Sequence, residues 1–541
     1  MRKPRLISHC YSRLLAALVA ILSVATSHAW PGDRIETLPF FVNSDFRTAD
    51  QHPSIAIGAN GDFIVVWDGI WGRRFSSDGS PHGDQFRVSP AAQNVRDERP
   101  VIAIDSDGDF VVAWFQQVLW PNPGANAIVG QRFNDAGEPV GGAFIVTSSS
   151  DPPDHDGPAI GMDADGDFVI IWTAEDPAGG PKRALGQRYD AAGVPQESNF
   201  RVNVSTESGA SNSAVAMNAA GDFVVAWHDI QNGDVCLEGA LCSVQGRSFT
   251  ADGSALSDGF TVSGTGPGAA VGKVAIAMNT VAGNFVIAFN RIAHSKEFGS
   301  ESIGIYARRF DDRAVPMGEE FRVSRFGRVQ FRGEISSSMN TRGDFVIAWI
   351  ANDADLYNSY LHTRLFRASG ASVTGDDQRF AEQRLYMPAG AFAPRDSAAA
   401  IDEQGSFIVA WQSQSDDPLG GTGPNIFGQR FAGPDDIRLS CEDIIATIVG
   451  TDRADVITGT PDRDVIIGAG GNDVIRGGAG DDMICGRWGD DRLYGDEGMD
   501  ILRGATGDDV LDGGADEDYC NGGKHITADK AVNCESSGDV P

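Results

Sequence analysis

From Gly450 onward a glycine recurs at every ninth residue, and this frame limits the folds open to the chain more than any other feature. The glycines are Gly450, Gly459, Gly468, Gly477, Gly486, Gly495, Gly504, Gly513 and Gly522. The sixth position of eight successive units is aspartate: Asp455, Asp464, Asp473, Asp482, Asp491, Asp500, Asp509 and Asp518. The eighth position is apolar: Ile457, Ile466, Ile475, Ile484, Leu493, Leu502, Leu511 and Cys520. Glycine permits tight turns and the apolar residue fills a narrow core, so the frame predicts stacked turns with aspartates in columns.

Such columns of carboxylates repel one another at neutral pH unless cations lie among them. We therefore expect folding and metal binding to be coupled in this region. Carboxylate and carbonyl oxygens are hard ligands, and calcium accepts flexible oxygen cages, whereas magnesium requires a stricter octahedron. The pattern favours calcium.

One unit, Gly477–Cys485, matches the nonapeptide G-G-x-G-x-D-x-U-x in full. Residues from roughly 448 to 523 resemble the RTX, or haemolysin-type, calcium-binding repeats. The resemblance implies a parallel β-roll in which calcium lies between turns, held by sixth-position aspartates and by carbonyls of the glycine-rich loops. It implies carboxylate ligands at Asp464, Asp473, Asp482, Asp491, Asp500 and Asp509. It implies carbonyl ligands around Gly468, Gly471, Gly477, Gly478, Gly480, Gly486, Gly489, Gly495, Gly498, Gly504 and Gly507.

The two ends of the array depart from this pattern. Thr451, Arg453, Thr460 and Asp462 stand where glycines are usual, and Asp516 replaces a fourth-position glycine near the end. We therefore expect incomplete sites at both ends, and roughly four to six calcium ions.

A longer repeat precedes the array. Its first half recurs seven times, at 55–67, 102–114, 160–172, 215–227, 276–289, 337–349 and 399–411. Each unit reads as four short strands joined by Asp/Asn/Gly turns, and no helical periodicity occurs in this stretch. Four strands repeated seven times predict an all-β fold with a seven-bladed β-propeller over residues 30–435; an open solenoid or a string of sandwiches is the alternative.

The seventh unit lacks an evident fourth strand after Phe431. The N-terminal segment Phe40–Asn43 matches Phe200–Asn203, so we expect it to complete the blade that begins near residue 399 and to close the ring. Ile437–Ser440 is the competing segment for this place.

The recurring charged residues of the repeat are predicted to have structural roles and not to bind ions. The arginines occupy the same strand position in each unit, which favours a repeated structural role over an anion site: Arg74, Arg132, Arg188, Arg309 and Arg430. The turns at Asp105–Asp109 and Asp163–Asp167 hold three carboxylates each, yet Asn218–Asp222 keeps the turn while lacking most of these ligands. Hairpin turns are therefore favoured over calcium loops at these places.

The connections that follow the second strands vary in length and chemistry, and binding usually resides in such loops. Candidate residues for a ligand face are Trp120, His228, Asp229, Asn290, Arg291, Asn352 and Asp353. An extracellular glycan or protein is the expected partner. No H-E-x-x-H or G-x-S-x-G motif occurs, so no catalytic residue is predicted; a secreted hydrolase or lyase with its active site on this face is the alternative.

Residues 1–29 read as a secretory signal peptide, with basic residues before an apolar run from Leu14 to Val24 and a small-residue end at Ala29. The run is shorter than the roughly 20 residues that span a bilayer, so cleavage is favoured over a retained anchor. We expect a secreted protein with no membrane span after cleavage. The net charge of −32 argues against nucleic acid as a partner.

Six cysteines remain after cleavage, and an even number in an exported chain favours disulfides. Cys236 and Cys242 share one short loop, and Cys520 and Cys534 flank the last repeat, which leaves Cys441 with Cys485. Free buried thiols are the alternative. The expected organisation is a signal peptide (1–29), the propeller (30–435), and a β-roll with a C-terminal disulfide cap (436–541).

Overall fold

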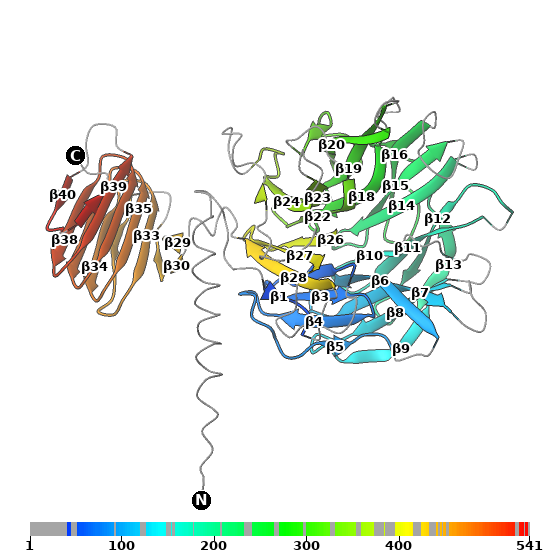
Figure 1. Ribbon diagram of the computed structural model, residues 1–541, viewed down its shortest axis with the longest axis horizontal. Coiled ribbons are helices and arrows are strands. Elements are labelled where there is room, and N and C mark those ends of the chain that lie inside the picture. The colour runs from blue at the N-terminus through cyan, green and yellow to red at the C-terminus, as the bar shows by residue number, and fades with distance from the viewer. Residues whose placement is uncertain are drawn as a thin grey trace, which may run out of the picture.

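A computed structural model describes the chain at residues 40–44, 51–90, 94–119, 126–147, 153, 157–176, 178–205, 208–231, 241–263, 270–295, 299–324, 331–352, 359–372, 383–384, 395–414, 424–431, 440–441, 444–445, 447–450, 454–524, 530–534 and 536–538. Within these ranges every regular element is a β-strand, and no helix capable of crossing a membrane occurs. The strands form a ring of small sheets and a stack of parallel strands (Figure 1). The predicted all-β class is confirmed. The predicted signal peptide and the predicted boundary near residue 435 lie outside the described residues.

The N-terminal unit consists of seven antiparallel sheets of four strands, which are the blades of a propeller. Blade 1 contains β2 (Ser54–Ile57), β3 (Phe63–Trp67), β4 (Trp71–Phe75) and β5 (Phe86–Arg87). Blade 2 contains β6 (Val95–Ile104), β7 (Phe110–Val118), β8 (Ala127–Phe133) and β9 (Pro139–Ile145). Blade 3 contains β10 (Ala159–Met162), β11 (Phe168–Ala174), β12 (Arg183–Tyr189) and β13 (Pro195–Arg201).

The remaining blades keep the same strand order. Blade 4 contains β14 (Ser208–Met217), β15 (Phe223–Gln231), β16 (Leu241–Phe249) and β17 (Phe260–Thr261). Blade 5 contains β18 (Ala270–Met278), β19 (Phe285–Ser295), β20 (Gly299–Phe310) and β21 (Phe321–Arg322). Blade 6 contains β22 (Phe331–Met339), β23 (Phe345–Asn352), β24 (Ser359–Phe366) and β25 (Gln383–Arg384). Blade 7 contains β26 (Arg395–Ile401), β27 (Phe407–Gln414), β28 (Pro424–Phe431) and, from the other end of the unit, β1 (Phe40–Phe41).

The blades hold together because the second strand of each is apolar on both sides and is buried between neighbours. The first strands contact one another around the ring, and β2 contacts both β6 and β26. Within each blade, aromatic rings of the second and third strands stack; Phe63 and Phe75, for example, lie 4.9 Å apart between centroids. Arginines of the third strands reach the next blade, where Arg132 Nη1 donates to the carbonyl of Ala192 at 2.6 Å. The recurring arginines for which such bonds are described thus have the structural role that the sequence predicted.

The ring closes through the N-terminal strand, as predicted. Phe40 pairs with Gly428 and Phe41 with Phe427, and Val42 N–H donates to the carbonyl of Ile426 at 2.9 Å. Gly428 is required here because a Cβ would lie 2.8 Å from the Phe40 ring. The competing segment does not pair with β28 where it is described, since Ser440 lies in β29 (Ser440–Cys441), which pairs with β30 (Ile444–Ile445).

The C-terminal unit is a parallel β-roll of two sheets. One sheet contains β31 (Ile448–Val449), β33 (Val465–Gly470), β35 (Met483–Trp488), β37 (Ile501–Thr506), β39 (Tyr519–Lys524) and β41 (Ser536–Gly538). The other contains β32 (Val456–Thr458), β34 (Val474–Ala479), β36 (Arg492–Glu497), β38 (Val510–Ala515) and β40 (Lys530–Val532). Successive strands alternate between the sheets, so two nine-residue units make one coil. The eighth-position residues pack into one fully buried column between the sheets, as predicted: Ile466, Ile475, Ile484, Leu493, Leu502, Leu511 and Cys520.

Disulfides close parts of both units. Cys520 is bonded to Cys534, as predicted, at a sequence separation of 14 residues. Cys242 and Cys485 are disulfide-bonded as well. Their expected partners, Cys236 and Cys441, have no described side chains, so these two pairings stay predictions.

Candidate metal centre

The sixth-position aspartates line the two edges of the roll, directly before the strands. Although charged, they are buried: Asp473 is 0% exposed and Asp464, the most accessible of those from Asp464 to Asp518, is 4% exposed. One-coil spacing places every second aspartate in the same column. The structure thus brings together, as two stacks, the carboxylates that the sequence pattern singled out.

One carboxylate oxygen of each aspartate belongs to the hydrogen-bonded framework. The backbone N–H of an aspartate donates to Oδ1 of the aspartate 18 residues later, as from Asp464 to Asp482 at 2.7 Å and from Asp482 to Asp500 at 2.8 Å. In the other column Asp473 N–H donates to Asp491 at 2.8 Å. These bonds set the orientation of each carboxylate from the coil before it.

The second oxygen has no hydrogen-bond partner in Asp473, Asp482, Asp491 and Asp500, although it is buried. Oδ2 of Asp482 points toward the first-position glycine of its own unit, where a Cβ on Gly477 would lie 2.3 Å away. The same contact would be 2.2 Å between Gly495 and Asp500. First-position glycine is therefore required because the carboxylate occupies the space of a side chain. A buried anionic oxygen without a partner is costly unless a cation completes it.

The electrostatics of the columns agree with this geometry. Burial, opposed by hydrogen bonds and assisted by neighbouring carboxylates, raises the pKa of Asp491 to about 7. Burial likewise raises the pKa of Asp482 and of Asp500 to about 6, and raises that of Asp473. In the absence of cations the protein thus disfavours the charged form of these groups.

Asp464 differs from the other members. Burial opposes ionisation there too, but hydrogen bonds from Thr460 and Thr447 lower the pKa of Asp464. Both of its oxygens accept hydrogen bonds, at 2.6 Å from Thr460 N–H to Oδ2 and at 2.8 Å from Thr447 Oγ1 to Oδ1.

The residues present fit calcium. Each turn offers one buried carboxylate beside a loop of backbone carbonyls, which are the hard oxygen donors that calcium prefers. Among the residues that the structure describes, no three His, Cys, Asp or Glu side chains gather in one place. The predicted fourth-position glycines stack closely; a Cβ on Gly489 would lie 1.9 Å from the carbonyl oxygen of Gly471. Whether these carbonyls and the predicted aspartates coordinate calcium stays a prediction.

The candidate ligand face of the propeller is built differently from the prediction. His228 and Asp229 lie inside β15, and Asn290 and Arg291 inside β19, not in loops. The hairpins extend further than expected because β15 continues to pair with β16 through Gln231. Asn352 ends β23, where its side chain is outside the described part, and Trp120 and Asp353 lie outside the described residues altogether.

The described side chains of this group pack within the blades. Asp229 Oδ1 accepts a hydrogen bond from Ser208 Oγ at 2.6 Å, and Arg291 pairs with Glu320 while lying over the Tyr306 ring. His228 is 2% exposed, and burial lowers its pKa to about 4. Asp229 and Arg291 are thus held within their blades, whereas His228 Nε2 and Asn290 Oδ1 are buried without a hydrogen-bond partner. Convergence of the group on a ligand site stays a prediction.

Sequence reasoning missed a histidine between two carboxylates at the closing seam. His52 Nδ1 lies 2.8 Å from Asp68 Oδ2, and His52 Nε2 lies 3.5 Å from Asp396 Oδ2. Asp68 also accepts a hydrogen bond from Arg99 N–H at 2.7 Å. Both imidazole nitrogens face protein carboxylates, so the group joins blade 7 to blades 1 and 2. His52 has a positive backbone φ of 48°, which is unusual for a residue other than glycine, and the sequence alone does not predict this conformation.

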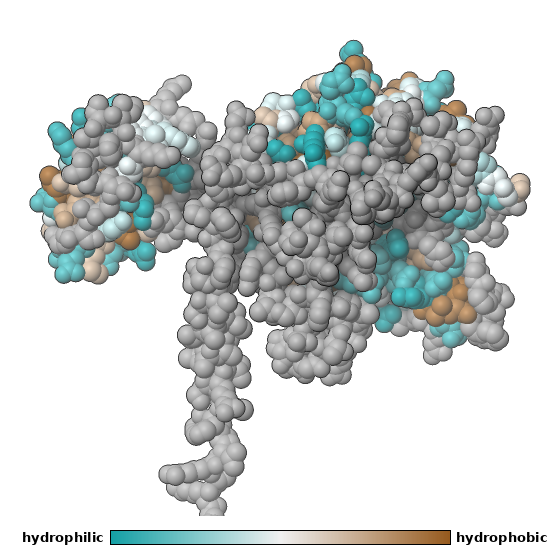
Figure 2. Space-filling view, turned by 45° about the horizontal axis from the view of Figure 1, so that its top comes forward, coloured by the Kyte–Doolittle hydropathy of each residue, from teal (hydrophilic) through white to brown (hydrophobic). Residues whose placement is uncertain are grey.

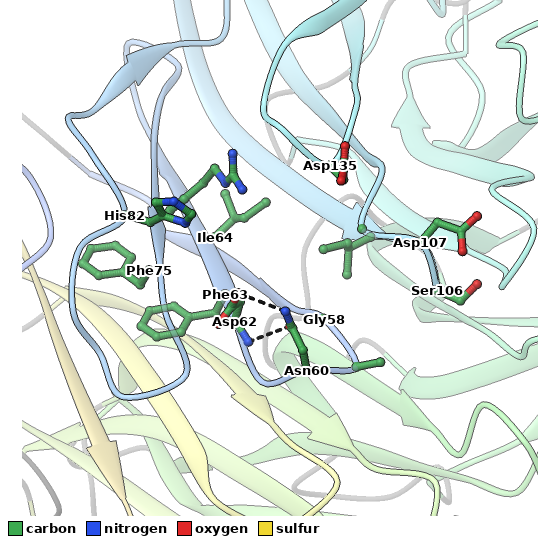
Figure 3. Close-up of a pocket in the computed structure, with 14 residues that line it drawn as sticks. Gly58, Asn60, Asp62, Phe63, Ile64, Phe75, His82, Ser106, Asp107 and Asp135 are labelled. Carbon is green, nitrogen blue, oxygen red and sulfur yellow. Dashed lines mark hydrogen bonds between the residues drawn. The ribbon is translucent and has the colours of Figure 1, made fainter.

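A cavity of about 310 Å³ opens between blades 1 and 2 on the side of the short turns (Figure 3). Gly58, which lines it, stands where the other blades have aspartate or asparagine at the start of this turn. Asn60 and Asp62 bond to each other within it at 3.0 Å, and none of its lining side chains is a buried group without a partner. Asp62, His82, Asp107 and Asp135 are among the residues that line it.

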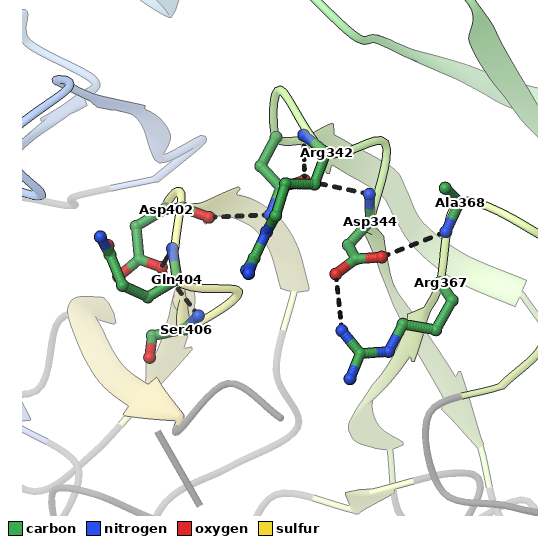
Figure 4. A network of polar contacts seen from close by, with 8 residues as sticks. Arg342, Asp344, Arg367, Ala368, Asp402, Gln404 and Ser406 are labelled. Carbon is green, nitrogen blue, oxygen red and sulfur yellow. Dashed lines mark hydrogen bonds and ion pairs between the residues drawn. The ribbon is translucent and has the colours of Figure 1, made fainter. Parts of the chain in front are cut away.

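The acidic turns have the structural role that the sequence predicted. Asp105 Oδ1 accepts the N–H groups of Asp107 and Asp109, each at 2.9 Å. Figure 4 shows the corresponding turns of blades 6 and 7, where Asp344 pairs with Arg367 at 2.9 Å and Asp402 accepts from Ser406 N–H at 2.8 Å. These carboxylates are occupied by turn donors.

Comparison with known proteins agrees with the geometry of the roll. Residues 449–484, 458–493 and 494–524 match the family of the RTX calcium-binding nonapeptide repeat, which confirms the predicted resemblance and supports calcium binding by this region. No curated protein matches the sequence.

Among solved structures, a protein of unknown function from Dyadobacter fermentans has a TM-score of 0.41 at 10% identity, covering 75% of this chain and 100% of its own. An alpha-L-arabinanase of Penicillium chrysogenum, complexed with arabinobiose, has a TM-score of 0.39 at 10% identity. This match covers 62% of this chain and 92% of the arabinanase chain. The polysaccharide lyase Uly1 has a TM-score of 0.35 at 11% identity, and this match covers 67% of this chain and 92% of the lyase chain. At such scores these likenesses support no conclusion about activity.

Proposed function

We propose that this is an exported calcium-binding protein. Several calcium ions order its C-terminal roll outside the cell, and its propeller presents a face to an extracellular glycan or protein. One observation carries the calcium part of the proposal: the second oxygens of four stacked aspartates are buried without a partner. Calcium at extracellular, roughly millimolar levels would fill sites with dissociation constants of about 10⁻⁴–10⁻³ M.

The chain's own residues supply the site. Oδ1 of Asp473, Asp482, Asp491 and Asp500 stays in the framework bond to the neighbouring coil, while Oδ2 and the carbonyls of the glycine-rich loops would hold the ion. Calcium supplies the positive charge that lets the carboxylates ionise in the folded roll. Because the columns cross all coils, binding stabilises the folded roll and not the unfolded chain.

The remaining parts rest on the sequence. Export is supported by the signal-like segment 1–29, and the propeller face by the variable connections after the second strands. Figure 2 shows both hydrophilic and hydrophobic side chains on the described residues that are visible from this side. The N-terminus of protein recovered from the medium tests export, because cleavage would leave Trp30 first.

Hydrogen exchange of the full chain, in calcium and in chelator, tests the proposed calcium dependence. The N–H groups of Asp473, Asp482 and Asp491 are buried donors of the columns and should lose protection in chelator. Amides in the second strands of the propeller, such as Val112 and Val225, serve as internal controls and should not change. Equal protection of the aspartate amides in both buffers would rule the proposal out.

A further inference from the structure

Gly459–Asp464, the first turn of the roll that the structure describes in full, is built differently from the turns after it. In the later units the second position adopts a left-handed backbone, with φ between 76° and 109°: Ala469, Gly478, Arg487, Asp496, Ala505, Gly514 and Gly523. The fourth position is left-handed as well: Gly471, Gly480, Gly489, Gly498, Gly507 and Asp516. Thr460 and Asp462 hold these two positions in the first turn, and neither has a positive φ.

The sequence explains this difference. Thr460 is β-branched, which makes a left-handed backbone unfavourable. It also precedes Pro461, and a residue before proline is driven toward extended conformations. The Thr460–Pro461 pair therefore prevents the loop conformation that the glycine-rich turns share.

The changed loop directs two donors to the carboxylate. Thr460 N–H and Thr460 Oγ1 donate to Asp464 Oδ2 at 2.6 Å and 2.8 Å. Oδ2 of Asp482, one coil later in the same column, has no partner at all. The space that faces a cation in the later turns is thus closed by hydrogen bonds in the first.

A second threonine completes the arrangement from the preceding coil. Thr447 Oγ1 donates to Asp464 Oδ1 at 2.8 Å, which is the oxygen that a backbone N–H occupies in later coils. The same Oγ1 accepts from Val465 N–H at 3.0 Å, and Thr447 N–H donates to the Val465 carbonyl at 2.8 Å. Three donor groups therefore hold Asp464, and both of its oxygens accept hydrogen bonds.

We propose that Gly459–Asp464 is a calcium-free end turn, in which Thr447 and Thr460 replace the cation, so that calcium ligation in the fully described turns starts at Asp473. This rests on the proposed calcium binding and revises the expectation that Asp464 is a ligand. The calcium-dependent coils are thus preceded by a coil that is already in register and whose buried carboxylate already accepts hydrogen bonds.

Counting calcium ions bound per full-length chain, by native mass spectrometry and equilibrium dialysis, tests the proposal. Asp464→Asn should leave the wild-type number of bound ions unchanged. Asp482→Asn, one coil away in the same column, should lower it by at least one, because this variant alone alters a carboxylate with an unsatisfied oxygen. Loss of an ion from Asp464→Asn, as from Asp482→Asn, would overturn the proposal.

A gain-of-site variant tests the same idea in the opposite direction. Thr460→Gly combined with Pro461→Ala restores the left-handed freedom of the loop and removes the hydroxyl donor, so it should bind one ion more than the wild type. An unchanged count in a variant with wild-type circular dichroism would contradict the proposal. If the wild-type chain itself bound no calcium, the proposed function would fail; if only the Asp464 and Thr460 variants behaved otherwise, the end-turn proposal alone would fail.

Discussion

The donors within reach of its two oxygens decide what each aspartate of this chain does. Asp105 accepts two N–H groups of its own turn and shapes a hairpin. Asp482 has one oxygen bonded and the other buried without a partner, which makes it a candidate ligand. Asp464 stands in the same column but is satisfied by threonines. Residue type and spacing alone do not separate these three roles.

A first-position glycine should tolerate no side chain. In Gly495→Ala the new Cβ would lie 2.2 Å from Asp500 Oδ2 and 2.2 Å from the Gly513 carbonyl oxygen. We expect a loss on the order of 3 kcal/mol in the stability of the roll, measured as a higher calcium concentration needed to order it by circular dichroism. Gly142→Ala is the control, because no atom lies within 4 Å of the added Cβ there; an equal effect of both would contradict the steric argument.

His228 should make the propeller sensitive to acid. Burial lowers its pKa to about 4, so between its ordinary value of about 6.5 and 4 the unfolded chain binds more protons than the folded one. Stability therefore falls as the pH falls through this window, by about 2 kcal/mol from about pH 7 to about pH 5. His228→Gln should flatten the pH dependence of the unfolding midpoint in denaturant, whereas a substitution at the exposed His82 should leave it unchanged. A variant that keeps the wild-type slope would show that His228 does not cause it.

At the scale of elements, strand pairing was more predictable than strand length. The match between Phe40–Asn43 and Phe200–Asn203 predicts the closing strand β1, and in the structure both segments place an aromatic ring over a glycine. The predicted ends of β15 and β19 were wrong. Because β15 continues to pair with β16 and β19 with β20, His228 and Asn290 lie in strands and not in loops. Pairing depends on the partner strand, which local pattern does not specify.

The seam should be weaker than an equivalent internal position. Asn43 Oδ1 accepts from Ile426 N–H and Asn203 Oδ1 from Ala184 N–H, each at 3.0 Å, but only β13 is joined to its partner by a continuous hairpin. We expect Asn43→Ala and Asn203→Ala each to cost about 1–3 kcal/mol. Amide exchange should accelerate more at Val42 in the first variant than at Val202 in the second. Equal acceleration would mean that the seam is no weaker than a hairpin.

At the scale of the whole molecule, cations interact in two different ways with the exposed net charge of −32 and with the buried aspartate columns. Exposed charges are screened by any salt, whereas a buried carboxylate oxygen needs a ligand in contact with it. The two units should therefore respond differently to ions, since the first aspartates of the propeller turns, such as Asp105 and Asp402, already accept hydrogen bonds from N–H groups of their own turns.

Sodium chloride should not replace calcium. At about 1 M salt the Debye length is only about 3 Å, so repulsion among surface carboxylates is largely removed. We nevertheless expect the Asp473 and Asp482 amides of the full chain to exchange in chelator plus salt as they do in chelator alone. If salt restored their protection, general screening and not coordination would explain the calcium dependence.

The sequence by itself determined the two repeating architectures, the closing strand, the buried eighth-position column and the calcium-binding character of the roll. These follow from periodicity, because residues at constant spacing face the same environment in every repeat. Only the tertiary structure decided which aspartates have an unsatisfied oxygen, and where His52 meets Asp68 and Asp396. The physical reason is that hydrogen bonding depends on donors delivered by another coil or blade: Thr447 reaches Asp464 only because the coils stack, and His52 reaches Asp396 only because the ring closes.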